Sequence, residues 1–241
     1  MKIIIDEKLV KRNKWIGKIL RWVSLACMVF GLFAVFSEKI ATNPALFFSF
    51  FVVMILGVLL SSVSSFFTSR FGNSPRPDEL IDKAFKGLDD RYQIYHYRST
   101  IPHLLISPVG VWSIIPTFVD GEIFYDQSKN NWFHKKNSFL NRFLQKENFP
   151  NPISEYEYHK KELLKIKDKA LLTEDPGLQL LIILMHKNAK LSGLNENDGI
   201  LILPFEKVKE RFRKNSKINN KDYAGIYTSL GDFLKPDLGR S

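Results

Sequence analysis

The segment Ile101–Tyr125, IPHLLISPVGVWSIIPTFVDGEIFY, decides the fold of the 241-residue chain. Two runs rich in β-branched and aromatic residues, His103–Ser107 and Val111–Phe118, flank a turn at Pro108–Gly110. A second turn, Asp120-Gly121, leads into a third such run. Short apolar runs separated by Pro and Gly are typical of successive strands in a mostly buried sheet. The segment therefore predicts three strands joined by tight turns.

The sequence on both sides of this segment predicts a mixed α/β domain. Apolar residues at helical spacing indicate amphipathic helices, and short continuous apolar runs indicate strands buried on both faces. Asn151 followed by Pro152 predicts an N-cap and the first position of a helix. We expect helices over Asp78–Leu88, 152–172 and Phe205–Arg213, and strands over Tyr92–Arg98, Leu178–Met185 and Gly199–Leu203.

The N-terminal part of the chain predicts a membrane-spanning hairpin. Ala45–Phe67 contains no charged residue, and as a helix it is long enough to cross a hydrocarbon layer of about 30 Å. Trp22–Phe36 is a second uncharged run, which Lys18 and Arg21 can extend because long basic side chains reach back to the membrane surface. A cleaved signal sequence is disfavoured, since Phe36 to Lys39 makes a poor cleavage site. A buried hairpin of a soluble protein is the alternative.

The charge distribution predicts the orientation of this hairpin. Two arginines, Arg70 and Arg76, follow the second span, whereas the connecting loop contains only Lys39 beside Glu38. By the positive-inside rule, we expect both termini in the cytoplasm and a two-pass protein in the inner (cytoplasmic) membrane. The basic residues before the first span are Lys2, Lys8, Lys11, Arg12, Lys14, Lys18 and Arg21.

Net charge and cysteine content limit the other classes of function. The net charge is +10, and about half of it lies in the membrane region, where contact with anionic lipid explains it. The remaining excess is too weak to establish nucleic-acid binding. The single cysteine, Cys27, excludes an intramolecular disulfide framework and a Cys-based zinc site.

Five regions follow from these patterns. We expect a basic cytoplasmic N-terminus over 1–15, a two-helix hairpin over 16–67 (helices about 16–36 and 45–67) and a linker over 68–77. A globular domain over 78–214 follows. A tail over 215–241, with one amphipathic helix, ends the chain.

The opening segment resembles the nuclease-related domain (NERD) family, a branch of the restriction-endonuclease-like PD-(D/E)xK fold. That family has an Asp-His pair opening one strand, a turn containing Gly, a strand with Glu-x-Lys, and a Gly before the next strand. His103, Gly110 and Gly121 match this framework. The segment Asn151–Glu155 is similar to the family's Asn-Pro-(Ser/Thr)-x-Glu motif. The resemblance covers 78–214 and implies a mixed sheet flanked by helices.

The residues that would carry the family's chemistry are replaced. Pro102 stands at the position of the Asp, Ile115 at that of the Glu, and Thr117 at that of the Lys. A divalent cation needs hard oxygen ligands, so hydrocarbon side chains cannot hold it. The resemblance therefore implies a catalytically inactive domain with no metal or other cofactor.

A relocated active site is the alternative. Other acidic residues lie near the expected site, and another lysine could take the place of the family's Lys. Together they would form a site for Mg²⁺ or Mn²⁺. Solvated surface charges are the more common explanation of such residues. The candidates for a relocated site are Glu79, Asp82, Lys83, Asp120 and Glu122.

One surface could contact phosphate or lipid headgroups. The densest basic cluster is interrupted by Glu206 and Glu210, which is also typical of a solvated helix with i, i+4 ion pairs. The aromatic residues near the strands are expected in the core more than in base stacking. The cluster consists of Lys207, Lys209, Arg211, Arg213 and Lys214.

These observations favour an interaction protein. We expect a membrane anchor that displays an inactive nuclease-like domain, which binds a protein partner or, with weaker support, nucleic acid. The alternatives are a membrane-tethered, metal-dependent nuclease and a small membrane subunit of a larger complex.

Overall fold

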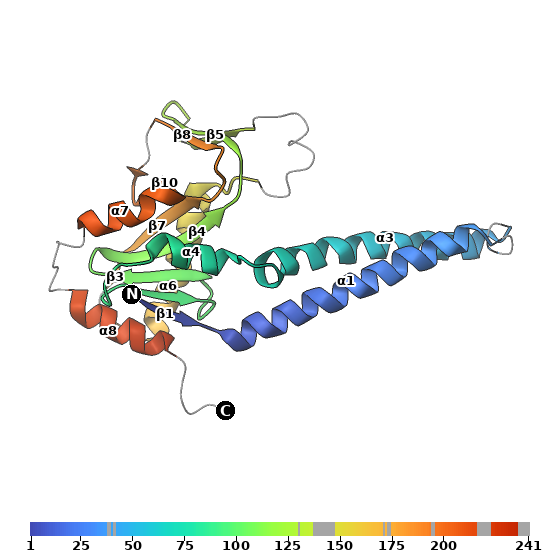
Figure 1. Cartoon of the computed structure of the whole chain (residues 1–241), viewed down its shortest axis with the longest axis horizontal. Coiled ribbons are helices and arrows are strands. Elements are labelled where there is room, and N and C mark those ends of the chain that lie inside the picture. The colour runs from blue at the N-terminus through green and yellow to red at the C-terminus, as the bar shows by residue number, and fades with distance from the viewer. Residues whose placement is uncertain are drawn as a thin grey trace. The chain divides into compact units, whose positions relative to one another are not determined.

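The computed structural model describes residues 1–37, 40, 42–129, 131–136, 148–170, 172, 175–193, 196–215 and 223–235 (Figure 1). The chain forms two compact units. One unit is Asp6–Glu79, which contains the two long helices. The other combines Met1–Ile5 with Leu80–Ser241 and contains the sheets. The boundary between the units falls within a helix, α4 (Pro77–Phe85).

The first unit is a hairpin of two antiparallel helices, α1 (Glu7–Val35) and α3 (Pro44–Phe67). Buried positions recur every seven residues on both helices, which is the spacing of a narrow helix–helix seam. Most of these positions carry small residues, so the two backbones approach closely. The seam consists of Val10, Gly17, Ser24 and Gly31 on the first helix, and of Gly57 and Ser64 on the second, continued by Phe71.

Two reciprocal hydrogen bonds close this seam. Ser24 Oγ donates to the Gly57 carbonyl at 2.8 Å, and Ser64 Oγ donates to the Gly17 carbonyl at 2.9 Å. Both bonds are buried. A hydroxyl that would otherwise be unsatisfied in an apolar layer thus ties each helix to a glycine of the other.

The outer surface of the hairpin is apolar and exposed. Phe33 is 70% exposed and Phe48 is 67% exposed, whereas the seam residues are buried. Large exposed aromatic side chains are unfavourable in water and ordinary in lipid. Both helices are long and apolar enough to cross a membrane.

The first helix starts earlier than the sequence predicted. It begins at Glu7, where we expected residues 1–15 to form a separate basic segment and the helix to start near residue 16. Asp6 caps it, since its carboxylate accepts from the Leu9 amide at 2.9 Å. The seam extends back to Val10, so the basic first turns are held by packing.

The expected linker over 68–77 is in part helical. Thr68–Gly72 forms a π-helical turn, η1, that continues α3. The linker residues Asn73–Arg76 then lead to Pro77, the first residue of α4. The helix α4 ends at Phe85, before Gly87, which has a positive φ of 90°.

The second unit contains a seven-stranded mixed sheet with the order β1-β2-β3-β4-β7-β10-β9. The strands β2, β3 and β4 pair antiparallel in sequence order, whereas the third strand predicted in 101–125, β5 (Gly121–Asp126), lies in a second sheet. The strands β7 and β10 then pair parallel to β4 and to each other. The strands are β1 (Lys2–Ile5), β2 (Gln93–His96), β3 (His103–Ser107), β4 (Gly110–Thr117), β7 (Leu178–Leu184), β9 (Glu196–Asn197) and β10 (Ile200–Pro204).

The first strand was not predicted. Residues 2–5 form β1, which pairs parallel with β2 in the register Lys2 with Gln93. The Lys2 amide donates to the Tyr92 carbonyl at 2.8 Å. The residues before α1 and those after α4 therefore belong to the same sheet (Figure 1).

Helices cover both faces of this sheet. The helices α4 and α7 (Phe205–Asn215) contribute Ile81, Phe85 and Phe212 to one core. On the other face, α6 (Pro152–Lys169) contributes Leu163, and α8 (Tyr223–Leu234) contributes Leu230. The sheet is thus the central layer of a helix–sheet–helix unit.

A smaller sheet has the strand order β6-β5-β8. Its residues Ile123 and Trp132 belong to a buried hydrophobic cluster. Its strands are β5 (Gly121–Asp126), β6 (Asn131–Lys135) and β8 (Ala189–Ser192). The predicted turn at Asp120-Gly121 precedes β5, and Gly121 has a φ of 100°. A Cβ there would lie 2.3 Å from the Lys135 carbonyl oxygen. Only glycine fits this position.

The hairpin seam yields a stability prediction. Gly57→Leu is expected to destabilise the full chain in detergent by about 1–3 kcal/mol, because a Cβ at position 57 would lie 3.1 Å from Cys27 Cβ. Ser62→Leu, on the exposed side of the same helix, is the matched control and is expected to change stability little. Thermal unfolding in detergent measures both. Equal midpoints for the two variants would contradict the close packing at Gly57.

Candidate functional site

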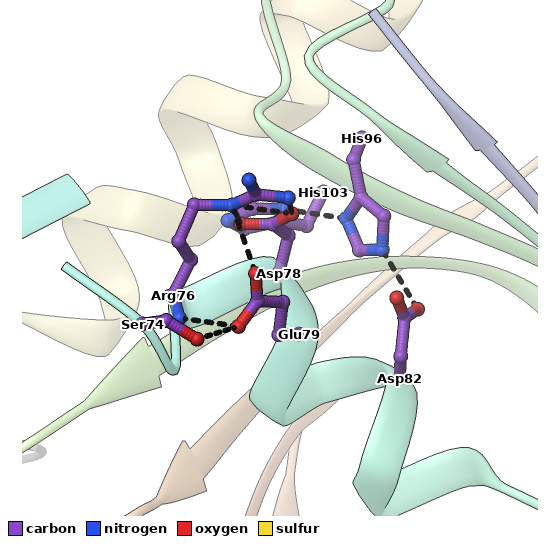
Figure 2. A network of polar contacts seen from close by, with 7 residues as sticks. All are labelled: Ser74, Arg76, Asp78, Glu79, Asp82, His96 and His103. Atoms are coloured by element: carbon purple, nitrogen blue, oxygen red, sulfur yellow. Dashed lines mark hydrogen bonds and ion pairs between the residues drawn. The ribbon is translucent and has the colours of Figure 1, made fainter. Parts of the chain in front are cut away.

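The most connected polar group of the second unit lies where α4, β2 and β3 meet. His96 is fully buried, and its two ring nitrogens have different partners (Figure 2). His96 Nδ1 lies 2.8 Å from His103 Nδ1, and His96 Nε2 lies 3.0 Å from Asp82 Oδ1. Asp82 is one-fifth exposed, so it connects the buried pair to the surface.

The distances restrict where the protons of this group can lie. An ionised Asp82 only accepts, so His96 Nε2 carries a proton and donates to it. The two Nδ1 atoms share a single proton, because two N–H groups cannot face each other at 2.8 Å. With its proton on Nε2, a neutral His96 accepts at Nδ1 from the Nδ1–H of His103.

The turn between β2 and β3 fixes the orientation of His103. Tyr97 has a positive φ of 58°, which is uncommon for a residue with a side chain. Its amide donates to the Pro102 carbonyl at 2.7 Å, and its ring lies 5.0 Å from the His103 ring. Pro102 thus acts here as part of a tight turn.

A second polar group occupies the start of α4. The Arg76 guanidinium forms a bidentate ion pair with Asp78, which is fully buried, and Arg76 is mostly buried as well. The hydrogen bond to Asp78 raises the pKa of Arg76 above its usual value. Glu79 accepts from Ser74 Oγ at 2.8 Å and from the Arg76 amide at 3.1 Å (Figure 2). This geometry is that of a helix cap with a buried ion pair.

Ile115 and Thr117, which the resemblance aligned with the family's Glu and Lys, are largely removed from solvent. The register Leu104 with Ser113 puts Ile115 and Thr117, two and four residues further along β4, on the same face as Leu104. Ile115 packs against the core cluster around Ile182, and Thr117 is 2% exposed. The surroundings of Ile115 and Thr117 therefore suit apolar side chains.

The residues proposed for a relocated site have separate partners. Asp82 contacts His96, Glu79 contacts Ser74 and Arg76, and Glu122 accepts from Ser192 Oγ at 2.5 Å. Asp120 is buried, and its carbonyl receives a hydrogen bond from His134 Nε2. Lys83 lies on α4 and is exposed. Within the described part of the chain, no three His, Cys, Asp or Glu side chains form a group that could hold a metal.

The basic cluster lies on α7, the predicted helix, but two of its side chains are paired with carboxylates. Arg211 pairs with Glu196 at 2.6 Å, and the expected i, i+4 pair joins Lys214 to Glu210 at 2.7 Å. Lys209 covers Gly87, where an added Cβ would lie 2.9 Å from its Nζ. Lys207 and Arg213 are exposed on the same helix.

One buried pair was missed by the sequence predictions. Ser113 Oγ on β4 lies 2.7 Å from His159 Nδ1 on α6, and both residues are buried. Burial lowers the pKa of His159, and the nearby Glu162 partly opposes this shift. A hydrogen bond from Lys165, with a second from Thr100, lowers the pKa of Glu162. Ser113 and His159 are 46 residues apart, so no local motif joins them.

Comparison of the chain with protein-family models, with curated proteins and with solved structures gives no match.

The histidine pair yields a mutational prediction. His96→Ala is expected to lower the free energy of unfolding by about 1–3 kcal/mol, because it removes the hydrogen bonds to both Asp82 and His103 inside the fold. His186→Ala, at an exposed position, is the control and is expected to cost less than about 0.5 kcal/mol. Denaturant unfolding of the full chain measures both. Equal losses would show that the buried group contributes nothing to stability.

The buried His159 yields a pH prediction. Its pKa is lower in the folded chain than in the unfolded chain, so the unfolded state binds more protons as the pH falls below about 6.5. Stability should therefore be full above that pH and decrease below it, by at most about 1.4 kcal/mol per pH unit. His159→Asn should flatten this part of the pH profile of unfolding. An unchanged slope between pH 5 and 6.5 would contradict the prediction.

Proposed function

We propose that the chain is a two-pass protein of the inner (cytoplasmic) membrane that displays a protein-binding domain in the cytoplasm. The domain is of the NERD type, with a restriction-endonuclease-like fold, and it lacks nuclease chemistry. Its partner is a protein, and its anchor is the hairpin α1–α3.

The order of elements supports the fold part of the proposal. One helix, α4, precedes the antiparallel strands β2, β3 and β4, and α6 then crosses over to β7, which pairs parallel to β4. Restriction-endonuclease-like domains begin with a helix and an antiparallel meander in the same way. His103, Gly110 and Gly121 are the first residues of β3, β4 and β5, which is compatible with the proposed family framework.

The position of β1 supports the orientation. Residues 2–5 precede the hairpin and pair with β2, which follows it. A hairpin with both ends in one sheet must return to the side of the membrane from which it started. The basic residues on this side, such as Arg21 and Arg70, favour the cytoplasm by the positive-inside rule.

The observation that carries the functional part is that the family's Asp, Glu and Lys positions are all replaced in this chain. Pro102 forms a turn, Ile115 packs against the core and Thr117 is buried. A metal-dependent hydrolase needs carboxylates and a cation there, and a fold without them retains its surfaces for binding. The charges on α7 favour a protein over nucleic acid, because Arg211 and Lys214 are already paired with carboxylates.

One experiment separates the candidate functions. The full chain, expressed in cells, is cross-linked with a lysine-reactive reagent and in parallel with ultraviolet light, and then purified in detergent. We expect protein cross-links to residues of 80–241 and no ultraviolet cross-link to DNA or RNA. The purified chain is also expected not to cleave plasmid, single-stranded DNA or RNA with Mg²⁺ or Mn²⁺.

Each other outcome supports a different function. Cleavage that is lost in Glu79→Ala would establish the metal-dependent nuclease with a relocated site and overturn the proposal. Ultraviolet cross-links that disappear when the basic residues of α7 are replaced by Gln would establish nucleic-acid binding. Cross-links confined to residues 6–79 would identify the hairpin as the working part within a larger membrane complex.

A further inference from the structure

One flank of the hairpin carries four basic side chains, and after Lys11 the three nearest the apolar part of α1 form one group. Relative to the seam at Gly17, Arg21 lies roughly 40° around α1, Lys14 roughly 60° and Lys18 roughly 100°, all to the same side, at 3.6 residues per turn. All three are exposed. Their spacing over two turns of helix forms a continuous stripe, which we call the basic flank (Lys14, Lys18 and Arg21).

The second helix contributes a hydroxyl to the basic flank. Arg21 Nη2 donates to Thr68 Oγ1 at 2.8 Å. Thr68 opens the π-helical turn η1, four residues after Ser64 of the seam. A guanidinium has five N–H donors, and this bond uses one of them. Thr68 therefore holds the Arg21 side chain in place while most of its donors remain available to an anion.

Aromatic side chains place this flank at the membrane surface. Trp15 is 64% exposed and Trp22 is 62% exposed, and they lie roughly 160° and roughly 140° from the seam, on the side of Lys18. Exposed indoles at the end of an apolar helix are typical of the headgroup region of a bilayer. The phosphates of lipids lie at the same depth.

The chain supplies almost no negative charge in this region. From Lys8 to Pro77 the only acidic residue is Glu38, which lies beyond the other end of α1. The basic flank therefore has no carboxylate of the hairpin within its own turns of helix. An external anion is the natural counter-charge for Lys14, Lys18 and Arg21.

The opposite flank of the hairpin is different. Arg70 lies on η1, on the other side of the seam, and its guanidinium stacks on the Phe66 ring at 4.4 Å. Over residues 14–21 the side chains of α1 on that side are apolar, such as Ile16 and Leu20, whereas Asn13 and Arg12 precede this stretch. In these turns of α1 the opposite flank has no basic side chain, in contrast to the basic flank.

We infer that the basic flank, together with Thr68, is a binding site for the phosphate headgroup of an anionic phospholipid. Arg21 binds the phosphate through the donors that Thr68 leaves available, and Lys14 and Lys18 neutralise the headgroup charge. The site rests on the proposed membrane anchoring. The inference goes beyond membrane anchoring, because it predicts a lipid bound at a defined place and not a uniform attraction to a charged surface.

Native mass spectrometry of the full chain tests this inference. The protein is released from nanodiscs that contain equal amounts of phosphatidylglycerol and phosphatidylcholine, and the retained lipids are counted. We expect phosphatidylglycerol to be retained preferentially. The triple variant Lys14→Gln/Lys18→Gln/Arg21→Gln should reduce this preference by roughly one to two orders of magnitude, because each basic group near an anionic surface contributes roughly a factor of five.

A matched variant removes the same charge elsewhere. Lys8→Gln/Arg12→Gln/Arg70→Gln also deletes three positive charges, none of which lies on the basic flank, and it should keep the lipid preference. Thr68→Ala should weaken the preference while leaving all charges in place. Equal loss in both triple variants would overturn the site, since the attraction would then be diffuse.

Two further outcomes are separated by simple controls. If millimolar inorganic phosphate displaces the retained lipid, the flank is a general phosphate site, and the lipid assignment is wrong. If alkaline carbonate washes the chain from membranes, the proposed anchoring itself fails. A chain that stays in the membrane but shows no lipid preference contradicts only the site.

Discussion

The parallel pairing of β1 with β2 is the constraint on which the rest of the structure depends. It joins residues 2–5 to residues 93–96 across the whole helical hairpin. Because β1 leads directly into α1 through the cap at Asp6, the first helix has no free N-terminal segment. The hairpin is consequently inserted into the sequence of a single folded unit, and both of its ends must return to it.

Close packing of α1 against α3 along the seam lets two helices return the chain to the sheet-containing unit. Gly17 and Gly57 allow close approach, and Ser24 and Ser64 bond the glycine carbonyls in a reciprocal arrangement. In an apolar layer, where water cannot compete, such hydroxyl bonds and small-residue contacts are the main source of helix association. The apolar outer faces suit contact with lipid, and the proposed basic flank lies toward the charged N-terminal end of α1.

Much of the second unit could be predicted because its signals are local. The runs around His103 and Val111 and the turns at Gly110 and Gly121 specify strands, and Asn151 with Pro152 specifies the start of α6, where the Asn151 side chain accepts from the Ile153 and Ser154 amides. These features depend on periodicity and on backbone conformation, which neighbouring residues determine.

The remaining features depend on partners distant in the sequence. β1 has only four residues, and it becomes a strand because β2 offers an open edge. The bond between His96 and Asp82 joins a strand to a helix, so neither residue predicts it alone. The basic character of α7 was predicted, but the pairing of Arg211 with Glu196 was not, since Glu196 lies on another element.

The most direct test of the β1 constraint is a disulfide between paired strands. Lys2→Cys and Gln93→Cys are introduced together in a Cys27→Ser background, because strands in register lie about 4.8 Å apart, within reach of a disulfide. Glu122→Cys with Lys135→Cys, a pair across β5 and β6, is the positive control. An intramolecular disulfide is expected in both pairs when membranes are oxidised. Formation in the control pair alone would contradict the pairing of β1 with β2.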